Sequence, residues 1–124
     1  MLWLALAALL APQSLEDQVR TLRDARATHD AARPADPGPA LAVWDRKRFD
    51  LQREHLSALY RLADHRNEPE IWKLVVAEGT AFLWDHDGTF AALHAHLPLA
   101  RAHQALGEWG PCFMHLAAAR AVEP

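Results

Sequence analysis

The chain has little of several residue types on which common protein classes depend. It contains one cysteine, Cys112, among 124 residues, which excludes an intramolecular disulfide and any metal site built from several cysteines. Valine, isoleucine and threonine are scarce, so the sequence favours helix over strand. Lysine and arginine together number 13 against 16 aspartate and glutamate residues, and they form no basic stripe. Nucleic-acid binding is therefore not expected.

Alanine and leucine, by contrast, are abundant, and hydrophobic residues make up 51% of the sequence. A hydrophobic content this high argues against disorder. A chain of 124 residues is long enough to bury one core and too short for two independent ones. The sequence therefore predicts an all-α fold with a single core, built from antiparallel helical hairpins.

The chain begins with an uncharged apolar run, MLWLALAALLA, that ends before Pro12. A helix needs about 20 residues to cross a bilayer, so this run is too short to span one and better matches the hydrophobic region of a secretory signal peptide. No lysine or arginine precedes it and no small-x-small cleavage site follows it, so an uncleaved anchor and the first core helix of a cytoplasmic protein stay open as alternatives. We expect residues 1–14 to be a signal peptide or hydrophobic anchor. The expected location is exported or periplasmic, with membrane association through this run.

Proline divides the rest of the chain. Three prolines and one glycine fall within residues 34–39, which no helix interior tolerates, so this stretch is the expected linker. It separates an N-terminal helical arm at 15–33, which Ser14 can cap, from an α-helical repeat-like domain at 40–124. The expected helices cover residues 15–31, 40–65, 69–84, 89–106 and 111–122.

Local signals set the ends of these helices. Asn67 is the expected cap of the helix that starts at residue 69. Pro98 removes a backbone hydrogen bond, so we expect a kink or a break near Leu97. Proline is tolerated in a first helical turn, and the last helix is therefore expected to begin at Pro111.

The last 32 residues carry small and large side chains at the spacings of a packed helical hairpin. The pattern consists of His96, Leu99, Ala100, His103, Gly107, Trp109, Cys112, Leu116, Ala119 and Pro124. Over residues 93–124 the chain resembles one tetratricopeptide repeat, with His96 and His103 in place of the usual aromatic residues. The resemblance implies a right-handed helical array, with a small helix bundle as the alternative. It also implies a left-handed Gly107 at the reversal, with Trp109 as a plug and Cys112 at a tight buried contact.

In that family, the first helix of each hairpin lines a concave groove that binds an extended peptide. Matched position by position, the partner-binding residues of this chain would be His94, Leu97, Arg101 and Gln104. Arg101 is the only lysine or arginine between Lys73 and Arg120, so it could hold a carboxylate of a partner. One repeat makes no groove, because about three are usually needed for a stable array, and an ordinary exposed arginine remains the alternative.

The eight histidines suggest a metal site, but their spacing does not support one. His94 and His96 lie two positions apart, on opposite sides of a helix, and cannot both bind one ion. Asp85, His86, Asp87 and His94 could meet on zinc only if Pro98 broke the helix. The segment 85–88 also resembles the front of a calcium loop, but leucine and histidine would occupy its first and last ligand positions, so we expect a turn.

Cys112 with His115 or His103 could form an activated thiol nucleophile. The hairpin pattern, however, demands a small buried residue at position 112, and we expect a structural cysteine there. We therefore expect no catalytic residue, no metal and no cofactor.

The function that these observations favour is a non-enzymatic protein–protein interaction module, similar to a tetratricopeptide repeat, that binds another protein through a helical surface. The first alternative is a small structural or accessory subunit of a larger, membrane-associated complex. The second is a metal- or thiol-dependent enzyme built on His86, His94, His103 or Cys112.

Overall fold

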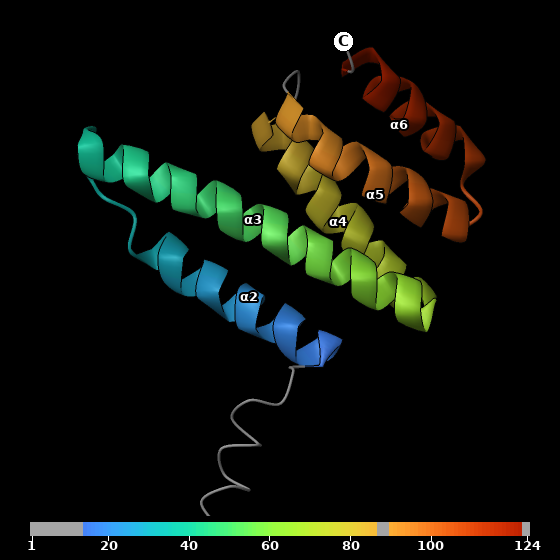
Figure 1. Cartoon of the computed structure of the whole chain (residues 1–124), viewed down its shortest axis with the longest axis horizontal. Coiled ribbons are helices and arrows are strands. Elements are labelled where there is room, and N and C mark those ends of the chain that lie inside the picture. The colour runs from blue at the N-terminus through green and yellow to red at the C-terminus, as the bar shows by residue number, and fades with distance from the viewer. Residues whose placement is uncertain (1–13, 87–89, 123–124) are drawn as a thin grey trace, which may run out of the picture.

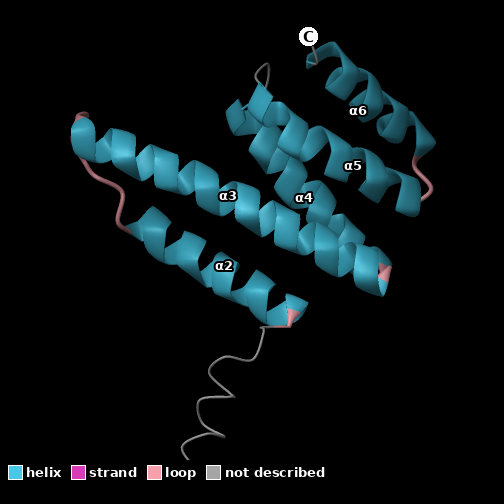
Figure 2. Cartoon of the chain, in the orientation of Figure 1, coloured by secondary structure: helices cyan, strands magenta, loops and turns pink. Residues whose placement is uncertain are grey.

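The computed structural model describes residues 14–86 and 90–122, and all the regular structure within these ranges is helical. Figures 1 and 2 show five α-helices, each antiparallel to the one before it. They are α2 (Leu15–Ala31), α3 (Pro39–Arg66), α4 (Pro69–His86), α5 (Leu93–Ala105) and α6 (Trp109–Val122), with a 3-10 helix η1 (Phe90–Ala92) before α5. The prediction of an all-α fold of helical hairpins is confirmed. The apolar run at residues 1–11 lies outside the described residues.

The core lies where α3, α4 and α5 meet. Its largest fully buried side chains are Leu56 of α3, Trp72, Val75 and Phe82 of α4, and Leu99 of α5. The three residues of α4 lie three and seven positions apart, which places them on one face of that helix. In the part of the chain that the structure describes, no helix combines the length and the hydrophobicity needed to span a bilayer.

A polar contact ties α2 to the rest of the molecule. Arg26 of α2 forms an ion pair with Glu78 of α4 at 2.5 Å and donates a hydrogen bond to Nδ1 of His55 on α3 at 2.8 Å. Burial lowers the pKa of His55, so the ring is neutral at pH 7 and its Nδ1 can accept this bond. One arginine thus joins three helices, and α2 is part of the packed body.

A second contact closes the connection between α2 and α3. The rings of His29 and Trp44 stack with centroids 4.9 Å apart, and the Trp44 indole N–H donates to the carbonyl of His29 at 2.8 Å. The His29 Nε2–H donates in return to the carbonyl of Trp44 at 2.9 Å. The proline-rich linker therefore connects two helix ends that hold each other in place.

Three details differ from the sequence-based expectations. Helix α6 begins at Trp109, two residues before the predicted start, because the carbonyl of Glu108 already accepts a bond from Cys112 N–H and Pro111 needs no partner in the first turn. Helix α5 runs through Pro98 without a break. Asn67 ends α3 in a left-handed conformation, and its side chain accepts a hydrogen bond from the Trp72 indole at 2.9 Å.

The hairpins α3–α4 and α5–α6 repeat one another at a spacing of 40 residues. Asn67 (φ 52°) and Gly107 (φ 75°) hold the left-handed position of the two turns. The first backbone bonds of the second helices, Trp72 N–H to Glu68 and Cys112 N–H to Glu108, are both 3.2 Å long. The buried positions correspond as well: His55 and Ala95, Leu56 and His96, Leu59 and Leu99, Leu62 and Ala102, Trp72 and Cys112, Val75 and His115, Gly79 and Ala119.

The left-handed conformation predicted for Gly107 is confirmed, and it generates a stability prediction. Gly107→Val should lower the free energy of unfolding by about 1–2 kcal/mol in urea denaturation, because a branched side chain strains a left-handed backbone. A Cβ at this position would meet no atom within 4 Å, so crowding contributes nothing.

Gly110→Ala is the matched control, because its site in α6 is equally open and carries no positive φ. This substitution should leave stability unchanged or raise it. Equal losses in both variants would contradict the assignment of the Gly107 effect to backbone strain.

Candidate functional site

Helix α6 has the composition of a buried helix but lies at the edge of the molecule. Arg120 is the only Lys, Arg, Asp or Glu between Trp109 and Val122. Among the described helices it packs only against α5 and η1, and several of its large side chains face solvent. The exposed fractions are 53% for Trp109, 62% for Phe113, 61% for Met114 and 44% for Leu116. A helix that is apolar on every side is normally buried by other parts of a protein, so the exposed apolar side of α6 is unusual.

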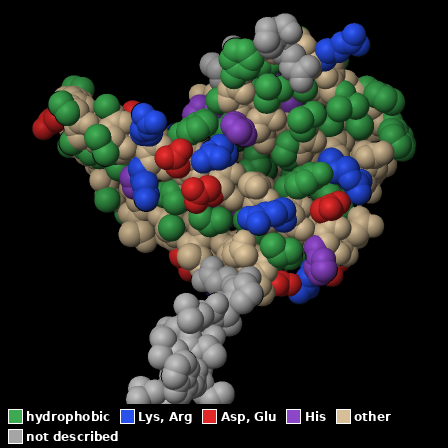
Figure 3. Space-filling model, in the orientation of Figure 1, with side chains coloured by type: hydrophobic (Ala, Val, Ile, Leu, Met, Phe, Trp, Pro, Cys, Tyr) green, Lys and Arg blue, Asp and Glu red, His purple; other side chains and the backbone are tan. Residues whose placement is uncertain are grey.

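A groove runs along this face between α5 and α6, with a volume of about 280 Å³. It is lined by Leu97, Ala100, Arg101 and Gln104 of α5 and by Trp109, Cys112, Phe113 and Leu116 of α6. In Figure 3, hydrophobic side chains gather over α5 and α6 at the upper right. We call this feature the α5/α6 groove.

Three of the four residues predicted to bind a partner line this groove, namely Leu97, Arg101 and Gln104. His94 does not. Its ring lies 6.4 Å from that of Phe49 and 6.3 Å from that of Phe82, against α3 and α4. The residue is exposed, and partial burial of its ring lowers its pKa.

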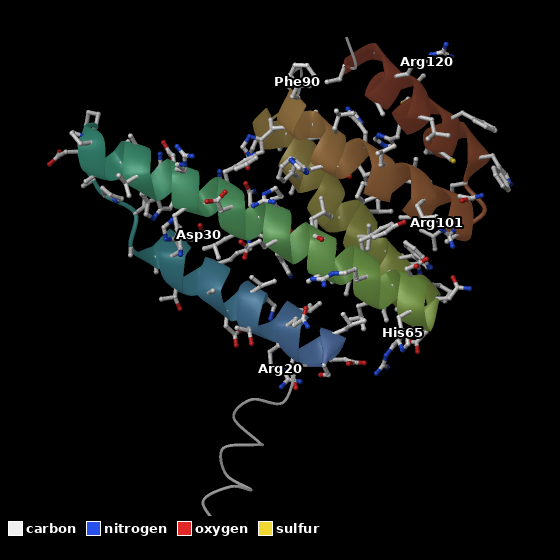
Figure 4. The ribbon with its side chains drawn as sticks, viewed as in Figure 1. Arg20, Asp30, His65, Phe90, Arg101 and Arg120 are labelled. Carbon is white, nitrogen blue, oxygen red and sulfur yellow. The ribbon has the colours of Figure 1, made fainter. Side chains whose placement is uncertain are left out.

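Arg101, labelled in Figure 4, already has partners inside the molecule. Its guanidinium carbon lies 5.0 Å from the centroid of the Trp72 ring, and its Nη2 lies 3.7 Å from Oδ1 of Asp64. A carboxylate from another molecule would therefore compete with Asp64. These contacts show how α5 sits on the preceding hairpin.

The surface that holds α5 corresponds to the α5/α6 groove. Tyr60, Asp64, Trp72 and Val76 stand 40 residues before the groove residues Ala100, Gln104, Cys112 and Leu116. Asp64 and Trp72 hold Arg101, and Leu99 of α5 fills the space above Gly79 so closely that an added Cβ would lie 2.7 Å from its Cγ. On the first hairpin a helix covers this surface, whereas on the second hairpin it is open.

Sequence reasoning missed the α6 half of the groove. Trp109 was expected to plug the hairpin, yet it is 53% exposed, and its ring centroid lies 6.2 Å from that of Phe113. A signal was present: Trp109, Phe113 and Leu116 follow the i, i+4, i+7 spacing of one helix face, and no carboxylate or lysine interrupts it.

Three histidines meet on the inner side of the same hairpin. Nδ1 of His96 lies 3.1 Å from Nδ1 of His115, and the rings of His103 and His115 stack with centroids 5.5 Å apart. Burial lowers the pKa of His115, and the neighbouring His96 and His103 lower it further. Within residues 14–86 and 90–122, no group of three or more His, Cys, Asp or Glu side chains has the arrangement of a metal site.

Asp85 and His86, which the sequence suggested as ligands, serve to join α4 to α3. Oδ2 of Asp85 accepts hydrogen bonds from Arg48 at 2.9 Å and from Gln52 at 3.0 Å. Partial burial opposes ionisation of Asp85, but the bonds from Gln52 and Arg48 outweigh it and lower the pKa. The His86 ring packs edge-on against Phe49 at 4.9 Å. The remainder of the suggested calcium-like loop, residues 87–88, lies outside the described residues.

Cys112 is buried, as predicted, with 5% of its surface exposed at the base of the groove. The native protein should therefore react with iodoacetamide much more slowly than the urea-unfolded chain, and Cys112→Ser should keep the helical circular dichroism spectrum with a small loss of stability. Rapid alkylation of the folded protein near neutral pH would contradict a structural role and favour a reactive thiol.

The lowered pKa of His115 predicts acid sensitivity. Because the unfolded chain takes up protons that the folded His115 resists, stability should fall as the pH drops below about 6.5. Burial also lowers the pKa of His55, His86 and His94, so these residues also reduce the stability of the fold at acid pH. His115→Val, which copies Val75 of the first hairpin, should lose less stability than the wild type between pH 7.5 and 5.5 in urea titrations. An unchanged pH dependence would contradict this role of His115.

No model of a known family, no curated protein and no solved structure matches the chain. The chain's own residues are therefore the only guide to its function.

Proposed function

We propose that the chain is a non-enzymatic protein–protein interaction module whose α5/α6 groove binds a helix of another protein molecule. The observation that carries the proposal is the exposed apolar face of an almost uncharged helix. The exposed parts of Leu97, Trp109, Phe113 and Leu116, all of which line the groove, together amount to roughly 400 Å². A patch of this size on a small protein marks an interaction site.

The geometry of the first hairpin supports a helix as the occupant. There, the surface that corresponds to the groove is covered by α5, which runs antiparallel to α4 (Figure 1). A helix that lay antiparallel to α6 would take the corresponding place on the second hairpin. The groove residues Ala100 and Cys112 are small, which allows a helix to approach closely.

The resemblance to a tetratricopeptide repeat supports the same kind of function with a different placement. The 40-residue spacing exceeds the roughly 34 residues of that repeat, and the two hairpins described here are fewer than the roughly three of a stable array. In this proposal Leu97, Arg101 and Gln104 therefore act at the open end of a stack of hairpins, while His94 lies outside the groove.

A site-specific photo-crosslinker at position 97, in cells that naturally make the protein, tests the proposal. The crosslinker should capture one defined helical segment, which mass spectrometry of the adduct identifies. A crosslinker at Thr28, exposed on α2, should not capture that segment.

Matched variants of α6 locate the contact. Phe113→Glu should abolish the adduct at position 97, because it places a charge in the apolar interface. Met114→Glu should retain it, because Met114 is equally exposed but lies about 100° around the helix from Phe113. Loss of the adduct in both variants, or its absence in the wild type, would argue against a helix in this groove.

A further inference from the structure

We infer that the molecule bound in the α5/α6 groove is a second copy of this chain, held by antiparallel pairing of the two α6 helices. This inference rests on the proposed function, because it fills the same groove. The proposed partner is another molecule of the same protein.

The outer face of α6 carries a regular stripe. Trp109, Phe113, Leu116 and Arg120 follow at i, i+4, i+7 and i+11, which places them within about 60° of one another around the helix. All four side chains are exposed. Trp109, Phe113 and Leu116 form one wall of the α5/α6 groove. The side chains of this stripe in one copy can therefore pack into the groove of another copy.

The order of residues in the stripe suits a twofold axis. With the axis between positions 114 and 115 and the helices antiparallel, Phe113 of one copy meets Leu116 of the other. Trp109 of one copy then meets Arg120 of the other. Each copy uses the same surface, as a closed twofold dimer requires.

The single charged residue of α6 decides the orientation. In the antiparallel pair, the Arg120 guanidinium lies over the Trp109 indole of the second copy, where a cation–π contact is favourable. Glu108, which precedes that tryptophan, adds a carboxylate at the same end. In a parallel pair the two Arg120 side chains would face each other and repel.

The available area matches a modest dimer. Each copy contributes roughly 400 Å² of apolar surface, and the flanking Arg101, Gln104 and Arg120 stems extend it toward the 800 Å² or so per partner of a standard interface. We therefore expect a reversible dimer whose population depends on protein concentration.

Sedimentation velocity of the purified full chain from about 1 to 200 µM tests the inference. The wild type should convert from monomer to dimer over this range. Phe113→Glu should stay monomeric, Met114→Glu should dimerise like the wild type, and Arg120→Glu should weaken dimerisation at least tenfold. Circular dichroism checks that each variant keeps its helices.

Disulfide trapping tests the orientation. In a Cys112→Ser background, copies that carry Trp109→Cys and copies that carry Arg120→Cys are mixed, each with a tag of different size. Antiparallel pairing should give mixed dimers faster than either like pair. Faster formation of like pairs would overturn the antiparallel arrangement.

The outcomes separate this inference from the proposed function. A wild type that is monomeric at every concentration, while the crosslinker at position 97 captures a helix of a different protein, overturns the second copy and leaves the proposed function standing. A monomer that also gives no adduct overturns both. A dimer that survives Phe113→Glu places the dimer contact elsewhere and overturns the inference.

Discussion

The close approach of α5 to α4 is the contact on which the rest of the structure depends. Leu99 is fully buried and lies directly over Gly79, where an added Cβ would come within 2.7 Å of its Cγ. Only glycine at this position allows the two helices to lie so close together. The contact fixes how the second hairpin sits on the first, and it therefore determines which face of α6 turns outward and where the α5/α6 groove opens.

The two hairpins share a register but differ in what they bury. At corresponding positions the first hairpin places Trp72 and Val75, whereas the second places Cys112 and His115. Large apolar side chains in the first hairpin form the core of the molecule. Small or titratable ones in the second line the contact between α5 and α6, and the largest side chains of α6 lie outside it. The same backbone arrangement thus produces a core in one hairpin and an exposed apolar groove in the other.

The helices could be predicted because their signals are local. Apolar residues recur at helical spacing, and Gly107 and the prolines of the linker mark where helices cannot continue. Contacts between helices could not be predicted, because Arg101 gives no sign in the sequence that it pairs with Asp64, 37 positions earlier. The same limit explains Trp109, whose expected burial depended on how α6 starts. Of the candidate site, Leu97, Arg101 and Gln104 came from the resemblance to a tetratricopeptide repeat, and the α6 half required the packed structure.

The proposed antiparallel pair of α6 helices would also stabilise a short stack of hairpins. A helical array gains stability as each hairpin covers the open face of its neighbour, and about three units are usually needed. The described residues supply two hairpins, and the second ends in an uncovered helix. The proposed pairing through α6 would cover that helix in both copies and would join the two stacks into one of four hairpins. In that dimer α6 would lie against its counterpart much as α4 lies against α5. The contact between the two chains would therefore repeat the antiparallel helix packing found within each chain.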